Sequence, residues 1–266
     1  MSDLIKAIVL GIVEGLTEFL PVSSTGHLIV VNEFIQFTGA FAKLFDIVIQ
    51  MGAILAVVVF FWRRLNPFSP RKSATERAIT WDIWKKTLVG VVPALLFGAA
   101  FGKKIQEHLF NPTVVALALL VGGLVLVIIE GRRRRSRFDS IAQLTYSNAL
   151  AIGLIQCLAM IPGTSRSAAT IIGAMLLGAS RVVAAEYSFY LAVPTLLAAS
   201  AYSLLKTDFV LSAAQIQALV IGFLVSFVVA WLVIAGFLKY VSKRDFKLFG
   251  YYRIFLGIFL LVYFLL

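Results

Sequence analysis

Charged residues are scarce in this chain, and cysteine is almost absent. Only 14% of the 266 residues are charged, while 61% are hydrophobic and the mean hydropathy is +0.96. A soluble domain of this length could not hide so much apolar surface, so an integral membrane protein is indicated. The single cysteine, Cys157, excludes an intrachain disulfide. The first residues lack the small-residue cleavage site of a secretory signal.

Acidic residues are the scarcer of the two charge types. The 24 Lys and Arg outnumber 13 Asp and Glu, which gives a net charge of +11. The basic residues lie at the ends of apolar segments and no nucleic-acid-binding motif accompanies them, so nucleic acid is not expected as a partner. The run 132–135, followed by Arg137, indicates instead a cytoplasmic link between membrane segments.

Long apolar runs are abundant. Six have about the length of a membrane-spanning helix, at residues 44–62, 87–102, 112–130, 183–204, 214–238 and 250–266. Two further apolar segments, 4–38 and 143–179, are broken in the middle by Pro21-Val-Ser-Ser-Thr-Gly and by Pro162-Gly-Thr-Ser. Such breaks are tolerated at membrane depth only beside protein or a water-filled cavity. We predict an all-α polytopic membrane protein with six spanning helices and two re-entrant helical hairpins.

The two broken segments resemble one another and indicate an internal repeat. The paired residues are Gly11 with Gly153, Glu14 with Gln156 and, after a slip of one residue, Pro21 with Pro162. Residues 45–56 match 187–198 at the same separation as the glycine pair. We predict one membrane domain, 1–266, in which repeats 1–130 and 143–266 are joined by the basic link 131–142. Paired broken segments of this kind are typical of a binding site at a repeat interface.

The links between apolar runs carry very different numbers of basic residues. The links 63–86, 131–142 and 239–249 hold 16 Lys and Arg, whereas 103–111 and 205–213 hold three. Because basic links stay in the cytoplasm, the second half should be inverted relative to the first. Both termini and the entrance of the first hairpin are then outside, and the hairpin tips meet near the midplane of the membrane.

Two carboxylates lie within the first broken segment. Glu14 and Glu18 share one helix face, and two such groups in an apolar segment are costly without a nearby cation. They are candidate catalytic residues and candidate ligands of a divalent cation, Mg²⁺ or Ca²⁺, which prefer oxygen ligands and often bridge to substrate phosphates. One of them could instead act as a general base.

Hydroxyl groups and a histidine surround the first break. Ser24 is a candidate nucleophile, and His27 is a candidate proton partner or an alternative nucleophile. Direct attack by water, with His27 as base, stays open. Because helix starts bind anions, Ser23, Thr25 and Gly26 are predicted to bind substrate phosphate.

The second break carries a guanidinium. Arg166 at membrane depth needs an anionic partner, and a phosphate that it grips with two hydrogen bonds fits this role. The neighbouring residues predicted to bind phosphate are Gly163, Thr164, Ser165 and Ser167. Together the two tips fit metal-assisted phosphoryl transfer.

Other polar residues carry weaker signals. Gln50 either lines the pocket or hydrogen-bonds a neighbouring helix. We expect the remaining charged residues near span ends to face the membrane interface or to extend their head groups toward it. These are Asp46, Arg181, Glu186, Lys239 and Arg253.

The whole chain resembles the bacterial undecaprenyl-diphosphate phosphatases, also called bacitracin-resistance proteins. The resemblance rests on the motif from Glu14 to His27, EGLTEFLPVSSTGH, and on PGTSRSAAT from Pro162 to Thr170. It implies hydrolysis of a polyprenyl diphosphate lipid to the monophosphate and phosphate, dependent on a divalent cation. That reaction recycles the lipid carrier of peptidoglycan synthesis at the bacterial inner membrane, with the active site open to the outer, periplasmic side.

Two alternative functions are also compatible with the sequence. One is a type-2 phosphatidic-acid phosphatase, although no Lys…Arg-Pro motif precedes Gly26. The other is a polyprenyl-phosphate transporter or flippase, since inverted repeats with broken helices are a transporter architecture. Release of phosphate by the purified protein distinguishes enzyme from carrier. The sequence leaves open a homodimer and the lipid chain length.

Overall fold

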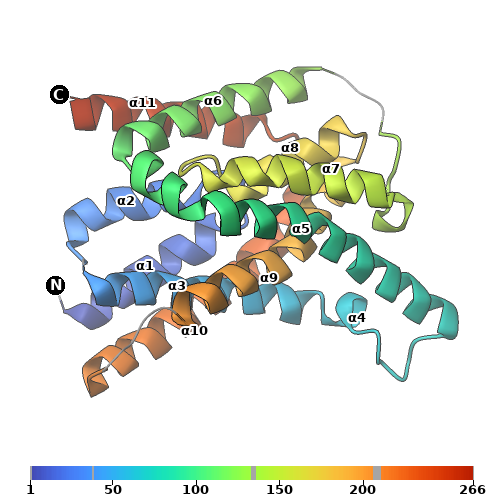
Figure 1. Cartoon of the computed structure of the whole chain (residues 1–266), viewed down its shortest axis with the longest axis horizontal. Coiled ribbons are helices and arrows are strands. Elements are labelled where there is room, and N and C mark those ends of the chain that lie inside the picture. Colours follow the sequence, from blue (N-terminus) through green and yellow to red (C-terminus); the bar gives the residue numbers. More distant parts are fainter. Residues whose placement is uncertain (1, 38, 133–135, 206–210, 266) are drawn as a thin grey trace.

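The computed structural model describes residues 2–37, 39–132, 136–205 and 211–265. Its regular structure is helical, apart from one isolated bridge between Phe138 and Ala179 (Figure 1). The helices of the first half are α1 (Asp3–Thr17), α2 (Ser24–Ile35), α3 (Ala40–Phe60), α4 (Trp62–Leu65), α5 (Ala74–Leu109) and α6 (Pro112–Gly131). Those that follow are η1 (Ile141–Gln143), α7 (Tyr146–Gln156), η2 (Cys157–Met160), α8 (Arg166–Leu176), α9 (Arg181–Leu205), α10 (Ala213–Val241) and α11 (Lys247–Leu265).

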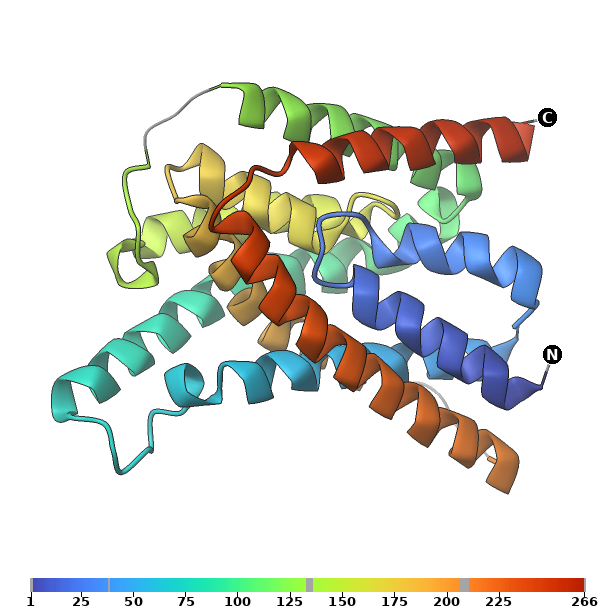
Figure 2. The same ribbon diagram turned by 180° about the vertical axis from the view of Figure 1, so that it is seen from behind.

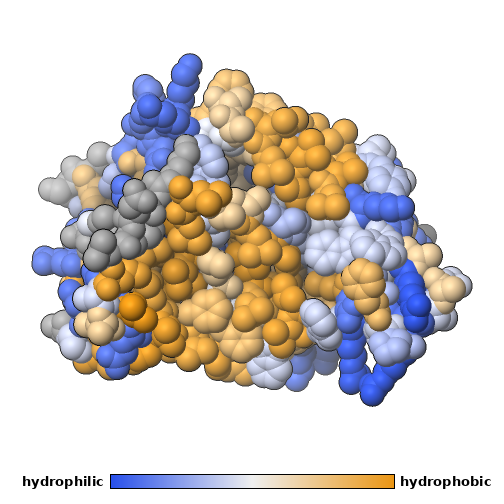
Figure 3. Space-filling model, turned by 60° about the horizontal axis from the view of Figure 1, so that its bottom comes forward, coloured by the Kyte–Doolittle hydropathy of each residue, from blue (hydrophilic) through white to orange (hydrophobic). Residues whose placement is uncertain are grey.

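Six of these helices are long and apolar enough to cross a membrane, namely α3, α5, α6, α9, α10 and α11. Each of them overlaps one of the six predicted runs, which confirms an all-helical membrane protein. Large apolar side chains such as Leu96, Val121, Leu232 and Phe255 are exposed on them. Figure 3 shows one face on which hydrophobic residues cover the middle and hydrophilic ones gather toward the two ends. Exposure of this kind is favourable where lipid covers the protein.

Helix α5 is much longer than its apolar run. The run 87–102 is short for a span, yet the helix continues for 36 residues from Ala74 to Leu109. Ser73 and Glu76 form a capping box that starts the helix upstream of the apolar part. Charged residues can occupy the first turns because those turns need not lie in hydrocarbon.

The two broken segments form helix pairs, α1 with α2 and α7 with α8. Each first helix packs on a long helix of the other half of the chain, α1 on α10 and α7 on α5 (Figures 1 and 2). A Cβ on Gly11 would strike the carbonyl of Gly222, and a Cβ on Gly153 would strike the carbonyl of Gly90. The same close backbone approach therefore occurs on both sides of the molecule, and only glycine permits it.

Helix α9 lies at the centre of the largest hydrophobic cluster. Its residues Tyr187, Phe189 and Leu191 are fully buried, and Phe189 stacks edge-on against Phe19 beside the first break. A second long pairing joins α6 and α11 at one face of the molecule (Figure 1). Helix α9 packs on α8, and α6 contacts both α2 and α8, so the helices that follow the two breaks are held against one another.

The prediction that charged residues near span ends extend toward the membrane surface is wrong for one arginine, Arg253, whereas Arg181 stays exposed although it also has a buried partner. Arg181 holds the buried carboxylate of Glu130 with three hydrogen bonds of 2.6–3.1 Å. Arg253 is fully buried. Guanidinium groups offer five donors, so polar partners inside the protein can outweigh the pull of the interface. The predicted run 132–135 falls largely on residues outside the described part of the chain.

Candidate active site

Each broken segment continues into a helix whose N-cap is a serine with a left-handed backbone. Ser23 caps α2 with a φ of 73°, and its Oγ accepts a hydrogen bond from Gly26 N at 3.4 Å. Ser165 caps α8 with a φ of 70°, and its Oγ accepts one from Ala168 N at 3.2 Å. A positive φ is uncommon for residues with a side chain, so both tips are held in one specific shape.

A cavity of about 160 Å³ lies between the two tips. One water molecule needs only roughly 10–15 Å³ by the same measure, so a larger polar group fits. The first half contributes Glu18, Ser23, Ser24, Thr25 and Gln50 to its lining, and the second contributes Ala159, Pro162, Gly163, Ser165, Arg166 and Leu196. Gln50 therefore lines the cavity, which was one of its two predicted roles.

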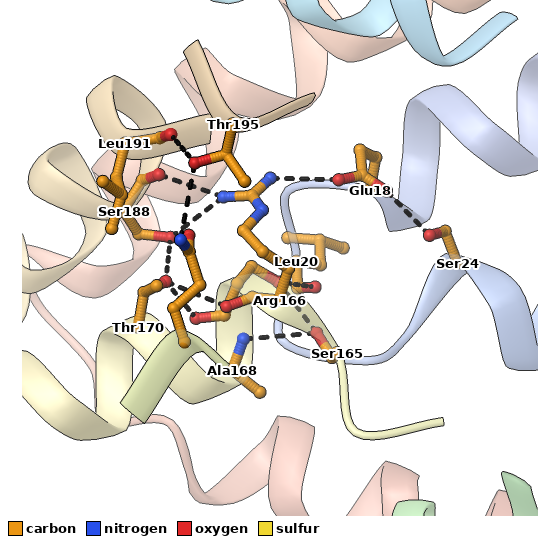
Figure 4. Close-up of polar contacts among 12 residues, drawn as sticks. Glu18, Leu20, Ser24, Ser165, Arg166, Ala168, Thr170, Ser188, Leu191 and Thr195 are labelled. Atoms are coloured by element: carbon orange, nitrogen blue, oxygen red, sulfur yellow. Dashed lines mark hydrogen bonds and ion pairs between the residues drawn. The ribbon is translucent and has the colours of Figure 1, made fainter. Parts of the chain in front are cut away.

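Glu18 and Arg166 form a buried ion pair across the two halves. Arg166 Nη2 donates to Glu18 Oε1 at 3.0 Å, and both side chains are less than a tenth exposed. Arg166 Nη1 donates to the carbonyl and to the hydroxyl of Ser188 at 3.0 and 3.3 Å (Figure 4). Thr170 in turn donates to Ser188 Oγ at 2.7 Å, so the guanidinium is held from behind. This support fixes the direction in which the arginine points.

Ser24 is hydrogen-bonded to the same carboxylate. Its Oγ donates to Glu18 Oε2 at 2.7 Å (Figure 4). The two ring nitrogens of His27 instead bond to Ser23 O at 2.7 Å and to the Tyr252 hydroxyl at 2.6 Å, and its ring stacks on that of Tyr252. The predicted pairing of Ser24 with His27 is therefore not formed in this structure. The side chain placed to take a proton from Ser24 is Glu18.

Glu14 is almost completely buried and lacks a partner for one oxygen. Its side chain lies within electrostatic range of Glu18, Asp46 and Arg166. Glu14 Oε1 has no hydrogen-bond partner in the described part of the chain. Its predicted repeat mate, Gln156, is also buried, and Nε2 of that residue donates to Thr195. A buried carboxylate with an unpaired oxygen needs a proton or a cation.

The donor set fits a divalent cation in part. Within the described residues, no three His, Cys, Asp or Glu side chains are grouped to hold a metal ion. Magnesium, however, is usually bound by one or two carboxylates together with waters and substrate phosphates. Glu14 supplies an oxygen without a partner, whereas both oxygens of Glu18 are already bonded. Glu14 is thus the better placed of the two predicted ligands.

The residues predicted to bind phosphate separate into two groups. Ser23, Thr25, Gly163 and Ser165 line the cavity. The remaining three do not belong to its lining. Ser167 is fully buried and donates to Leu20 O at 2.7 Å, which ties the two tips together, while Gly26 faces Leu119 and Thr164 accepts a hydrogen bond at its carbonyl.

Three residues around the tips were not predicted to take part in the site. Ser188 holds Arg166, and Tyr252 holds His27, but a hydroxyl in an apolar helix gives no distinctive signal. Arg253 could have been found, because a charge inside an apolar run defaults to a functional hypothesis, as it did for Arg166.

A known protein family and several known proteins resemble the chain over nearly its whole length. The family described as "Bacitracin resistance protein BacA" matches residues 7–259. The chain is 51% identical to undecaprenyl-diphosphatase 1 of Clostridioides difficile, covering 100% of this chain and 98% of the relative. It is 48% identical to the undecaprenyl-diphosphatase of Limosilactobacillus fermentum, with 100% and 99% covered, and 47% identical to that of Enterococcus faecalis, with 98% and 96% covered.

Proposed function

The chain belongs to the bacitracin resistance protein BacA family, and on this premise we propose that it is a membrane phosphatase acting on undecaprenyl diphosphate. The products are undecaprenyl phosphate and inorganic phosphate. Such a reaction returns the lipid carrier to peptidoglycan synthesis and confers resistance to bacitracin. Its expected surroundings are the lipids of the bacterial inner membrane, which its six apolar helices are long enough to cross.

One observation carries the proposal more than any other. Among the described residues, Glu14 Oε1 and Arg166 Nε are buried atoms of candidate site residues that lack hydrogen-bond partners; Arg166 lines the cavity, whereas Glu14 is not part of its lining. The first is an acceptor suited to a cation, and the second is a donor suited to an anion. A divalent cation with a bound phosphate would satisfy both, which an apolar solute would not.

The reaction requires the terminal phosphorus to exchange one oxygen for another. In the proposed sequence Ser24 Oγ attacks that phosphorus, its proton passes to Glu18, and the bond from phosphorus to the bridging oxygen breaks. The lipid monophosphate leaves with the bridging oxygen, and water then cleaves the phosphoserine to release phosphate. The 2.7 Å hydrogen bond from Ser24 to Glu18 favours this route over attack by His27, whose nitrogens are both engaged elsewhere.

Arg166 would bind the oxygens of the reacting phosphate and stabilise the charge that develops on them. Glu14, with Glu18 beside it, would hold Mg²⁺ or Ca²⁺, which supplies charge neutralisation to the phosphates. Ser23, Thr25, Gly163 and Ser165 would surround the head group from the two helix starts.

We further propose that the two halves form an inverted-topology repeat with re-entrant hairpins. Ser23 and Ser165 have nearly the same φ and the same separation in sequence as Gly11 and Gly153. The equivalent packing of α1 on α10 and of α7 on α5 supports the same relation. The membrane domain then has its repeats at 1–130 and 143–266.

The pocket is proposed to open to the outer, periplasmic side, with both termini outside. The start of α1 and the end of α11 lie at one end of the molecule, near the turn between α5 and α6 (Figures 1 and 2). The basic loop before α5 lies at the opposite end (Figure 1). Single cysteines at Thr25 and Thr164, without Cys157, should test this in spheroplasts. An impermeant thiol reagent should label Thr25→Cys, and labelling only after the membrane is opened would place the pocket on the cytoplasmic side.

The experiment for the activity is release of phosphate from undecaprenyl diphosphate by the purified protein in detergent. The matched control is Ser24→Ala, which should release none. A wild-type protein that moves the lipid across liposomes without releasing phosphate would instead support the transporter alternative.

A further inference from the structure

Arg253 contacts the backbone of both broken segments at once. It lies on α11 and is fully buried. Its Nη1 donates to Pro21 O at 3.3 Å, and its Nη2 donates to Gly163 O at 3.2 Å and to Thr164 O at 3.0 Å. A further hydrogen bond of 3.2 Å reaches Ala118 O on α6. One guanidinium therefore joins the first break, the second break and α6.

Three of the four carbonyls that Arg253 binds, those of Pro21, Gly163 and Thr164, lie in the breaks and have no helical partner, whereas Ala118 O lies within α6. Carbonyls at helix ends have no donor within their own helix, and water is scarce at membrane depth. An arginine is suited to such a place because it offers five N–H donors and no acceptor. Since its fork is planar and rigid, it also sets the distance between Pro21 O and the carbonyls of Gly163 and Thr164.

The charge of Arg253 has no counter-ion among the residues that the structure describes. No carboxylate forms an ion pair with it in the part of the chain that the structure describes, whereas Arg166 and Arg181 each have one. Gly163, whose carbonyl Arg253 binds, lines the cavity. The positive charge thus lies directly behind the cavity wall. A buried charge without a partner is costly, and an anion in the cavity would reduce that cost.

We infer that Arg253 is a positioning residue for the lipid diphosphate. Its fork holds the two tips at the spacing that the reaction needs, and its charge attracts the diphosphate through the cavity wall. This inference rests on the proposed function. The inference predicts two separate effects. The spacing of the two tips should affect kcat, and the charge of Arg253 should affect the affinity for the diphosphate.

Helix α6 offers a matched pair of variants that disturb Arg253 without replacing it. A Cβ on Gly122 would strike Arg253 Nη2, so Gly122→Ala displaces the guanidinium while its charge remains. Gly131 lies on the same helix with open space around it, so Gly131→Ala is the control.

The test combines these variants with Arg253→Lys and Arg253→Gln in the full-length purified protein. Phosphate release from undecaprenyl diphosphate gives kcat and KM, calorimetry gives the affinity for inorganic pyrophosphate, and thermal unfolding reports the fold. Arg253→Lys and Gly122→Ala should keep pyrophosphate affinity within about threefold and lose about tenfold in kcat. Arg253→Gln should lose about tenfold in both. Gly131→Ala should match the wild type.

Several results would overturn the inference. Arg253→Gln with wild-type affinity and turnover would do so, as would a Gly122→Ala protein indistinguishable from Gly131→Ala. So would losses in kcat that follow the loss of folded protein in every variant. If Arg253→Gln does not fold, Arg253→Lys and the glycine pair still decide. A wild-type protein that releases no phosphate would instead contradict the proposed function. Its affinity for inorganic pyrophosphate would still test the role of the Arg253 charge.

Discussion

Replacement of Arg166 by lysine tests whether the guanidinium geometry, and not merely its charge, serves the reaction. The arginine binds Glu18 through Nη2 and Ser188 through Nη1, on two sides of one planar group. A lysine keeps the positive charge but has a single ammonium, which cannot bond to both partners and to a phosphate in the same arrangement. At least one hydrogen bond to a charged group is therefore lost.

The size of the effect follows from that loss. A hydrogen bond to a charged group contributes about 1.5–3 kcal/mol. Because about 1.4 kcal/mol corresponds to a tenfold change in rate, kcat/KM of Arg166→Lys should fall by roughly 10- to 150-fold. The assay is phosphate release from undecaprenyl diphosphate at low and at saturating substrate, with thermal unfolding to show that the variant is folded.

Arg181 provides a matched control for this experiment. It also binds a buried carboxylate, Glu130, through both of its oxygens, but it does not line the cavity. Arg181→Lys should therefore lower the unfolding temperature while it leaves kcat/KM within about threefold. A folded Arg166→Lys protein with wild-type turnover at both substrate concentrations would refute the assignment of Arg166 to phosphate binding.

Three further predictions concern the carboxylates and the nucleophile. Ser24→Ala should abolish turnover, and acid quenching of the wild type should trap phosphoserine; phosphohistidine in its place would exclude Ser24. Glu14→Gln should raise the Mg²⁺ or Ca²⁺ concentration needed for half-maximal rate by about tenfold, and an unchanged metal titration would make Glu14 structural. Tyr252→Phe, which removes the hydroxyl 2.6 Å from His27 Nε2, should retain activity within about threefold. A loss of activity as complete as that of Ser24→Ala would instead indicate that His27 takes part in the reaction.

The positions of the helices were largely predictable because hydrocarbon imposes a length. About 20 apolar residues are needed to cross it. Each of the six predicted apolar runs overlaps a helix long enough to do so. The beginning of α5 was not predictable in this way, because its charged first turns lie outside any apolar window. Its signal was local instead, a serine followed three residues later by a glutamate.

The site was predictable in composition but not in pairing. Glu14, Glu18 and Arg166 were found because charges are expensive in apolar segments. That Ser24 bonds to Glu18 and not to His27 depends on how α2 is rotated against α1, which no spacing along one helix reveals. The role of Arg253 depends on contacts with Pro21 and Gly163, which precede it by 232 and 90 positions in the sequence. The apolar segment around Arg253 therefore predicted only an arginine that extends toward the membrane surface.

The formal charges around the tips explain why a cation should accompany the substrate. Glu14 and Glu18 are two negative groups, and Arg166 and Arg253 are two positive ones, so these four cancel. A diphosphate head group entering alone would bring an unbalanced negative charge into a site walled by apolar helices, which is costly. Together with a divalent cation it would enter nearly neutral, and the cation would meet the unpaired oxygen of Glu14. Arg166 would then act through the direction of its guanidinium, because Ser188 holds it from behind and it lines the cavity between the two breaks, while Arg253 holds the backbone of the breaks themselves.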